Sequence, residues 1–103
     1  MSYYQVFISA EDQEQTTIIL DALLAKKLVL GGPFISGPAK FWWKGEIVAM
    51  EYGYIVTYTS ATLKDQVIAE VERVSEEEVP MISFLPMEGN QKLVDLLEAT
   101  LTK

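Results

Sequence analysis

The sequence feature that most constrains the fold is an aromatic run that leads into a glycine, Phe41-Trp42-Trp43-Lys44-Gly45-Glu46-Ile47. Glycine accepts positive φ without a Cβ clash, so Lys44-Gly45 predicts a tight hairpin turn. The flanks, residues 40–43 and 46–59, are rich in the aromatic and β-branched residues that strands favour. We therefore expect a long central hairpin. Its two tryptophans either occupy opposite faces of an edge ribbon, as adjacent strand residues do, or contact a ligand directly.

Length and composition indicate a single domain, residues 1–103, that associates with itself. Half of the 103 residues are hydrophobic, and the chain holds two Trp, five Tyr and four Phe. A chain of this size has room for one core. Because this apolar content exceeds what so small an interior needs, we expect a partner to cover the surplus.

Charge and missing residue types exclude several functions. A net charge of -7 with one arginine, Arg73, argues against nucleic acid and anionic membranes as partners. The start Met1-Ser2-Tyr3-Tyr4 lacks the basic region of a signal peptide, so we expect a cytoplasmic protein. Without His or Cys, the chain cannot form Ser-His-Asp or Cys-His pairs or the usual zinc sites. We expect no enzyme, with a carboxylate-based hydrolase as the remaining catalytic alternative.

Hydrophobic periodicity predicts the elements of the first half of the chain. Residues 3–9 are apolar on both strand faces, which is typical of a central strand. A helix is expected over residues 10–27, opened by a capping box from Ser9 to Asp12. Residues 29–41 contain several glycines and prolines, which predicts an irregular edge strand and not a phosphate loop.

The second half completes a known architecture. We expect a helix from Thr62 to Val74 with a capping box of Thr62 and Asp65, a strand over residues 79–85 and a helix over residues 91–101. The order of elements predicts an α+β fold, a ferredoxin-like βαββαβ sandwich with an extra C-terminal helix.

The long strand after the turn has two distinct faces. Tyr52, Tyr54, Val56 and Tyr58 alternate with Ile55, Thr57 and Thr59. In the ferredoxin-like topology, helices cover one face of the sheet only. An uncovered aromatic face is costly in water, so another copy of the chain is the most economical cover.

Acidic and thioether side chains are the remaining candidates for metal ligands. Glu76-Glu77-Glu78 ends a predicted helix, where it forms either a solvated charge run or an oxygen-ligand site for Mg²⁺ or Ca²⁺. The acidic residues at positions 11, 12 and 14 are explained by a helix start. The internal methionines are isolated in apolar segments, as packing residues are, and do not suggest a copper(I) site.

An ordered set of motifs resembles the CutA family of divalent-cation tolerance proteins. The motifs are Trp43-Lys44-Gly45-Glu46-Ile47, then Glu78-Val79-Pro80, then Leu85-Pro86 followed by Gly89-Asn90, together with a leucine-ended first helix. The resemblance implies a tight homotrimer with its sheets inward, related to PII signalling proteins. It also implies a role in copper and divalent-cation tolerance, with small ligands or cations bound in clefts between subunits.

Departures from the family pattern define the open alternatives. Leu30-Gly31 stands where many members carry Ala-Cys, Ser75 replaces a His, and Tyr58 replaces a Lys. Loss of thiol and imidazole argues against soft-metal binding. A divalent cation is thus the only suggested cofactor, and its identity is left open. The alternative is a PII-like small-molecule or nucleotide sensor that binds no metal. The candidate lining residues of a pocket between subunits are Trp43, Glu46, Tyr58 and Glu78.

Overall fold

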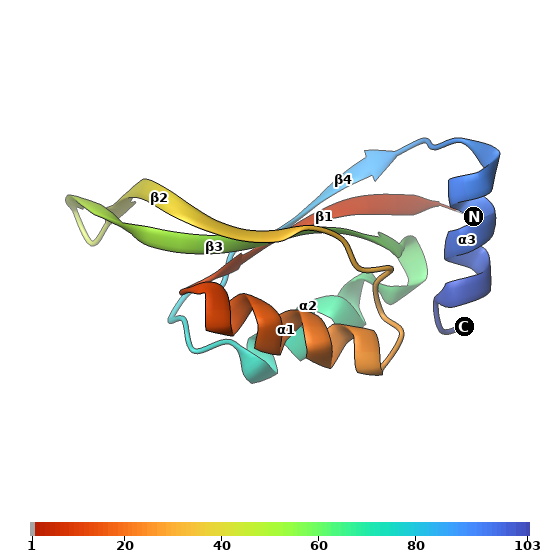
Figure 1. Cartoon of the computed structure of the whole chain (residues 1–103), viewed down its shortest axis with the longest axis horizontal. Coiled ribbons are helices and arrows are strands. Elements are labelled where there is room, and N and C mark those ends of the chain that lie inside the picture. Colours follow the sequence, from red (N-terminus) through yellow and green to blue (C-terminus); the bar gives the residue numbers. More distant parts are fainter. Residues whose placement is uncertain (1) are drawn as a thin grey trace.

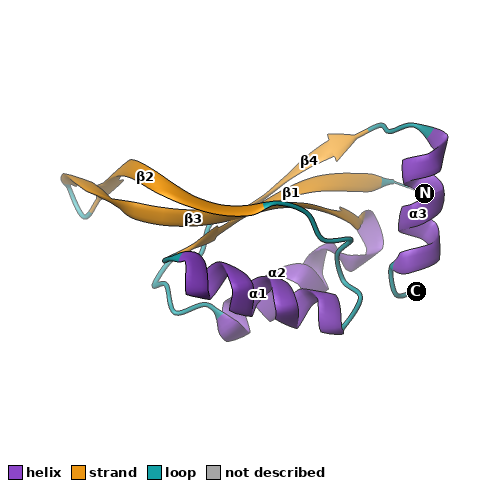
Figure 2. Ribbon diagram, viewed as in Figure 1, coloured by secondary structure: helices purple, strands orange, loops and turns teal. Residues whose placement is uncertain are grey.

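The computed structural model describes residues 2–103 and contains a four-stranded antiparallel sheet in the order β2-β3-β1-β4. Helices α1 and α2 lie against one face of this sheet, and α3 lies at its end (Figures 1 and 2). The expected ferredoxin-like α+β fold with an extra C-terminal helix is confirmed. Along the chain the elements are β1 (Tyr3–Ala10), α1 (Gln13–Ala25), β2 (Phe34–Trp43), β3 (Glu46–Ser60), the 3-10 turn η1 (Ala61–Leu63), α2 (Lys64–Val74), β4 (Ile82–Met87) and α3 (Gln91–Thr100).

The central hairpin is confirmed. Strands β2 and β3 pair from Phe34 opposite Ile55 to Trp43 opposite Glu46. Lys44 and Gly45 form the turn with φ values of 50° and 84°, and positive φ at both central positions matches the twist of a two-residue hairpin. The hairpin extends past the helices, at the left of Figure 1, in a molecule measuring 43 × 24 × 20 Å.

The core lies between the sheet and its helices. Alternate residues of β3 point to this side, as predicted, and its members Ile55, Thr57 and Thr59 are buried. The Thr59 hydroxyl donates to the Leu28 carbonyl oxygen over 2.7 Å, which ties the segment after α1 to the sheet. The largest fully buried apolar side chains are Val6, Ile8, Ile19, Leu23, Val29, Ile55, Leu63, Val67, Val71 and Leu97.

Helix α1 is shorter than predicted at both ends. Its N-cap is Asp12, whose carboxylate accepts a 2.8 Å hydrogen bond from the Gln15 amide, so the capping box from Ser9 is wrong. Lys27 has a φ of 54°, and the Leu28 amide donates to the Leu23 carbonyl oxygen. A residue in the left-handed conformation followed by this 6→1 hydrogen bond is a common helix end. The backbone therefore leaves the helix before Lys27, although the apolar spacing of the sequence continues to Leu28.

Three further boundaries differ from the sequence predictions. Thr62 lies inside η1, and its hydroxyl shares a hydrogen bond with the hydroxyl of Ser60 at the end of β3. Helix α2 begins without a side-chain cap, so the capping box predicted from Thr62 to Asp65 is also wrong. Strand β4 starts at Ile82, three residues later than predicted, and includes Pro86. The segment over residues 29–41 is a regular strand from Phe34 onward, because Pro38 lies on an edge strand where its missing N–H costs little.

Candidate functional site

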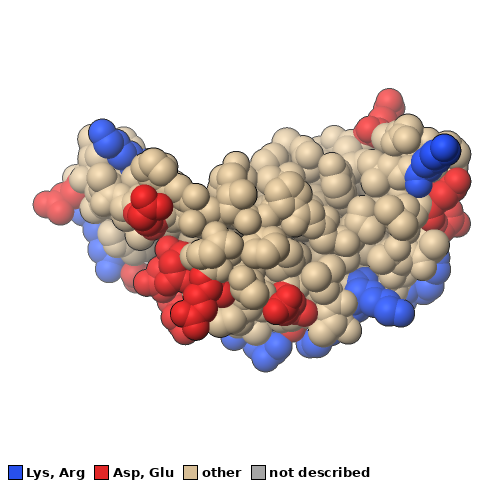
Figure 3. All heavy atoms as spheres, in the orientation of Figure 1, with Lys and Arg blue, Asp and Glu red and all other residues tan. Residues whose placement is uncertain are grey.

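The sheet surface opposite α1 and α2, here called the open face, carries large apolar side chains. Tyr52, Tyr54, Val56 and Tyr58 of β3 lie on it, as predicted from their alternation. Ile35 is 48% exposed, Tyr54 43% and Leu85 52%. Figure 3 shows a largely uncharged upper surface, hollowed where the hairpin leaves the body, with acidic side chains gathered below that point.

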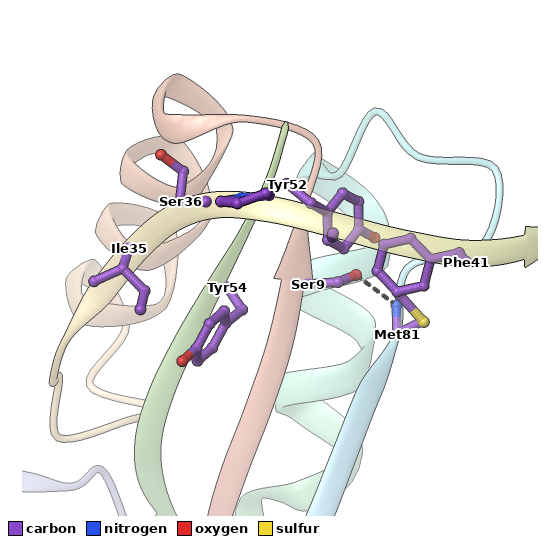
Figure 4. A pocket seen from close by; sticks show the side chains of 10 residues that line it. Ser9, Ile35, Ser36, Phe41, Tyr52, Tyr54 and Met81 are labelled. Carbon is purple, nitrogen blue, oxygen red and sulfur yellow. Dashed lines mark hydrogen bonds between the residues drawn. The ribbon is translucent and has the colours of Figure 1, made fainter. Parts of the chain in front are cut away.

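A hollow of about 290 Å³ opens on this face, lined by residues of β1, β2 and β3 and by Met81. Ser9, Phe41, Tyr52 and Met81 lie at one end of it, and Ile35 and Tyr54 lie at the other (Figure 4). The rings of Phe41 and Tyr52 pack edge to face with their centroids 4.8 Å apart. The hollow thus has aromatic and aliphatic walls with hydroxyl groups at one end.

A hydrogen-bonded group of three side chains closes that end of the hollow. The Ser9 hydroxyl donates to Oε1 of Glu77 over 2.9 Å, and the Tyr52 hydroxyl donates to Oε2 of the same carboxylate. The Met81 amide donates to the Ser9 oxygen over 2.8 Å. These bonds hold the segment between α2 and β4 against the end of β1.

The Tyr52 phenol keeps its proton far into the alkaline range. Burial, and then the Glu77 carboxylate, which accepts the phenol proton and repels a phenolate, raise the pKa of Tyr52 to about 12. The carboxylate of Glu11 also contributes to this rise in the pKa. The carboxylates of Glu77 and Glu11 therefore both disfavour a phenolate at Tyr52.

Two of the four predicted pocket residues meet at the hairpin tip, and a third, Glu78, is linked to the tip through Lys44. Trp43 and Glu46 are opposite each other in the strand register. Lys44 lies with its ammonium nitrogen 5.3 Å from the Trp43 ring centroid and 3.3 Å from Oε2 of Glu78. Lys44 and Glu78 are both mainly exposed, so this ion pair contributes little to stability.

Tyr58 lies away from this group. It follows Glu46 by twelve positions on the same strand, roughly 40 Å if the strand is fully extended. It is half-buried at the end of the sheet, packed against the core. One chain therefore does not place Tyr58 beside Trp43, Glu46 and Glu78, and a pocket lined by all four stays a prediction.

Sequence reasoning missed the network of Ser9, Tyr52 and Glu77. The interpretation of Glu76-Glu77-Glu78 as a solvated run is wrong for Glu77, which is half-buried, while Glu76 and Glu78 are exposed. Ser9 and Glu77 are 68 positions apart. Nothing in the local sequence distinguishes Glu77 from its neighbours, because the contact depends on how the segment after α2 docks on β1.

Metal-ligand groupings and membrane spans were both sought in the described chain. Within residues 2–103, no group of three or more His, Cys, Asp or Glu side chains is placed to hold a metal ion. The most buried acid, Glu70, is bonded to Lys26 over 2.8 Å and to Arg73 over 2.7 Å. None of the helices between residues 2 and 103 combines the length and apolarity that crossing a bilayer requires.

Comparison with known proteins gives a family match over nearly the whole chain. A family model described as CutA1 divalent ion tolerance protein matches residues 4–100. No curated protein sequence matches the chain.

Solved structures with the same fold come from distant organisms. CutA1 from Oryza sativa superposes with a TM-score of 0.93 at 19% identity, covering 100% of this chain and 96% of that one. The divalent cation tolerance protein from Thermus thermophilus superposes with a TM-score of 0.90 at 22% identity, covering 97% of this chain and 99% of that one. The periplasmic divalent cation tolerance protein CutA from Archaeoglobus fulgidus superposes with a TM-score of 0.89 at 25% identity, covering 95% of this chain and 97% of that one.

Proposed function

The chain belongs to the CutA1 family of divalent ion tolerance proteins, and from this premise we propose that it acts in divalent-cation tolerance, including that of copper, as a cytoplasmic homotrimer. In this proposal it works by binding or signalling and not by catalysis. The observation that carries the proposal is the family match over residues 4–100. The absence of His and Cys from the sequence makes any bound cation depend on oxygen ligands.

The open face supports the assembly. Ile35, Tyr54 and Leu85 each expose about half of their side chain there, although the opposite face is packed by helices. Contiguous apolar surface of this kind marks an interaction site, and closed symmetric assemblies of one chain are the commonest way to cover it. The trimer is the form that the family resemblance implies.

The proposed ligand site lies between subunits. Trp43 and Glu46 lie at the hairpin tip and Glu78 is linked to it through Lys44, whereas Tyr58 lies near the far end of the same hairpin strand. A pocket that uses both ends needs the tip of one copy and the sheet end of another. Two or more carboxylates brought together in this way would supply hard oxygen ligands for a divalent cation.

A second candidate function is that of a PII-like small-molecule or nucleotide sensor that binds no metal. The hollow beside Phe41, Tyr52 and Tyr54 favours it, because small organic ligands bind in apolar concavities that contain a few oriented polar groups. Its volume of about 290 Å³ lies near the small end of ligand pockets.

Calorimetric titration separates the two functions. Chelator-free protein is titrated with Cu²⁺, Zn²⁺ and Mg²⁺, alongside a Glu46→Gln/Glu78→Gln variant and a control Glu72→Gln/Glu88→Gln variant that removes two exposed acids elsewhere. Saturable uptake at a fixed ratio per trimer, lost only in the first variant, supports cation tolerance. Indifference to metals together with a melting shift induced by a nucleotide or metabolite supports the sensor.

A further inference from the structure

The ammonium group of Lys44 already lies at the proposed cation site. Its nitrogen is 3.3 Å from Oε2 of Glu78 and 5.3 Å from the centroid of the Trp43 ring. Trp43 lies opposite Glu46 in the strand register, so these two side chains share one face of the hairpin. A positive charge of the chain itself therefore contacts one proposed ligand carboxylate and lies over the ring that neighbours the other.

The turn itself does not explain why this position is a lysine. Lys44 and Gly45 have φ values of 50° and 84°. A residue with a Cβ seldom adopts positive φ, and Asn, Asp or Gly are the usual residues at the two central positions of such a turn. What distinguishes the lysine from those residues is the reach and charge of its side chain, which contacts Glu78 and Trp43.

The ion pair of Lys44 and Glu78 is built to exchange. Their side chains are 67% and 64% exposed, and an exposed ion pair contributes little to stability. The other ion pairs within residues 2–103 are of a different kind, because they hold the 5% exposed Glu70 between Lys26 and Arg73. Glu78 can therefore lose its lysine partner without a cost to the fold, whereas Glu70 cannot lose both of its partners in this way.

A divalent cation competes with Lys44 for the same carboxylate. It carries twice the charge of an ammonium group and takes carboxylate oxygens as ligands, so its attraction to Glu78 is stronger. At the distance of the present ion pair, the metal ion and the ammonium group would repel each other across the carboxylate. Cation binding therefore requires the ammonium group to leave Glu78. The flexible stem of a lysine allows this without a change in the backbone.

We propose that Lys44 is a built-in competitor at the cation site: its ammonium group holds the Glu78 carboxylate in the metal-free protein and is displaced when a divalent cation binds. This inference rests on the proposed cation site at the hairpin tip. Displacement takes the ammonium group away from the Trp43 ring, so the metal-free and metal-bound proteins present different tips. Lys44 thus sets the cation concentration at which the tip changes.

Calorimetry with Zn²⁺ tests the competition on the protein in its native assembly. Lys44→Gln removes the charge, Lys44→Arg keeps it, and Lys40→Gln removes a charge from an exposed position of the same hairpin. Lys40 precedes Lys44 by four residues, roughly 13 Å along a strand, where about 0.1 M salt largely screens its charge.

The three variants should separate clearly. Lys44→Gln should bind Zn²⁺ about tenfold more tightly than the parent protein, because the competing charge is gone. Lys44→Arg and Lys40→Gln should bind Zn²⁺ as the parent protein does. Equal or weaker binding by Lys44→Gln would overturn the inference. An equal gain in Lys40→Gln would also overturn it, because it would reflect net charge and not a contact.

Trp43 fluorescence gives a second readout, which a purely structural lysine would not change. The chain has two tryptophans, so a Trp42→Phe background leaves Trp43 as the only one. In this background Zn²⁺ should shift the emission of Trp43, and Lys44→Gln should shift it without metal, because both take the ammonium group from the ring. A zinc-induced shift as large in Lys44→Gln as in the background protein would contradict displacement.

The same titrations separate this inference from the proposed function. Equal Zn²⁺ affinity in the parent protein and in Lys44→Gln would overturn the role of Lys44 and leave cation binding in place. Uptake by Lys44→Gln alone would support the inference, because the lysine would then exclude the cation from the parent protein. Uptake by neither protein would contradict the cation site and this inference together.

Discussion

The Tyr52 hydroxyl donates a hydrogen bond to the carboxylate of Glu77, which joins the open face of β3 to the segment that follows α2. Ser9 donates to the other oxygen of the same carboxylate. One half-buried charge therefore fixes three parts of the chain: the end of β1, the middle of β3 and the approach to β4. This contact also lies at one end of the hollow, because Ser9 and Tyr52 both line it.

Tyr52→Phe tests this network through its pH dependence. The folded pKa of Tyr52, about 12, exceeds the ordinary value of 10.0, so the associated stability is complete below pH 10 and is lost as the pH rises through about 12. The variant should lose about 1 kcal/mol at pH 8, the usual net value of one hydrogen bond. Urea unfolding from pH 8 to 12 should show a steeper fall for the parent protein, with Tyr54→Phe as control. Parallel pH curves for the parent protein and Tyr52→Phe would contradict the assignment.

Glu70→Gln tests the bridge between α1 and α2. Hydrogen bonds from Arg73, and then from Lys26, lower the pKa of Glu70 to about 2 from its ordinary 4.5. A lowered carboxyl pKa stabilises the fold above pH 4.5, and this contribution is lost as the pH falls through about 2. Replacing the 5% exposed Glu70 should cost about 1 to 2 kcal/mol at pH 7.

Chemical unfolding from pH 7 to pH 2 provides the measurement for Glu70. The difference between the parent protein and Glu70→Gln should shrink toward the acid end. Glu72→Gln, an exposed acid on the same helix, should behave like the parent protein. A difference that stays constant down to pH 2 would mean that Glu70 titrates normally.

Gly53→Ala tests how closely α1 approaches β3. A Cβ at this position would lie 2.6 Å from Cγ2 of Thr16 and 3.2 Å from the Asp12 carbonyl oxygen. Overpacking of this kind costs about 1 to 3 kcal/mol. The matched control is Gly37→Ala on the neighbouring strand, where a Cβ would meet nothing within 4 Å. Thermal unfolding should rank Gly53→Ala well below Gly37→Ala, and equal melting temperatures would refute the close approach.

Tyr54→Lys tests the open face as the surface between copies. A lysine there would put charge into the proposed interface, which is costly to bury, so the oligomer should dissociate. Ile18→Lys is the control, because Ile18 on α1 is 42% exposed and Tyr54 is 43% exposed. Light scattering after size-exclusion chromatography should show a smaller particle for Tyr54→Lys alone. An unchanged particle in that variant would place the interface elsewhere.

The regular parts of the fold were predictable from periodicity and turn chemistry. Lys44-Gly45 indicated the turn because its conformation is local, and the alternation from Tyr52 to Tyr58 gave the correct faces of β3. The capping predictions failed since Ser9 and Thr62 have the right spacing but lie in β1 and η1, where strand pairing and a 3-10 turn determine the backbone. Spacing alone does not determine which residue becomes the cap.

The candidate site was predictable only where it depends on one hairpin. Trp43 and Glu46 are neighbours through the turn, so local sequence placed them together. The pairing of Glu77 with Ser9 and Tyr52 joins segments that are 68 and 25 positions apart. Such contacts arise from tertiary docking, which leaves no local pattern in the sequence.

Native mass spectrometry of protein purified without chelator or affinity metal tests the central claim most directly, because it reports the number of subunits and any retained ion together. The account predicts a homotrimer of about 35 kDa, three times the 11.6 kDa chain, and one that gains mass equal to a divalent cation when the metal is added at stoichiometric amounts. A monomer, or a trimer whose mass is unchanged by copper, zinc and magnesium, would contradict it.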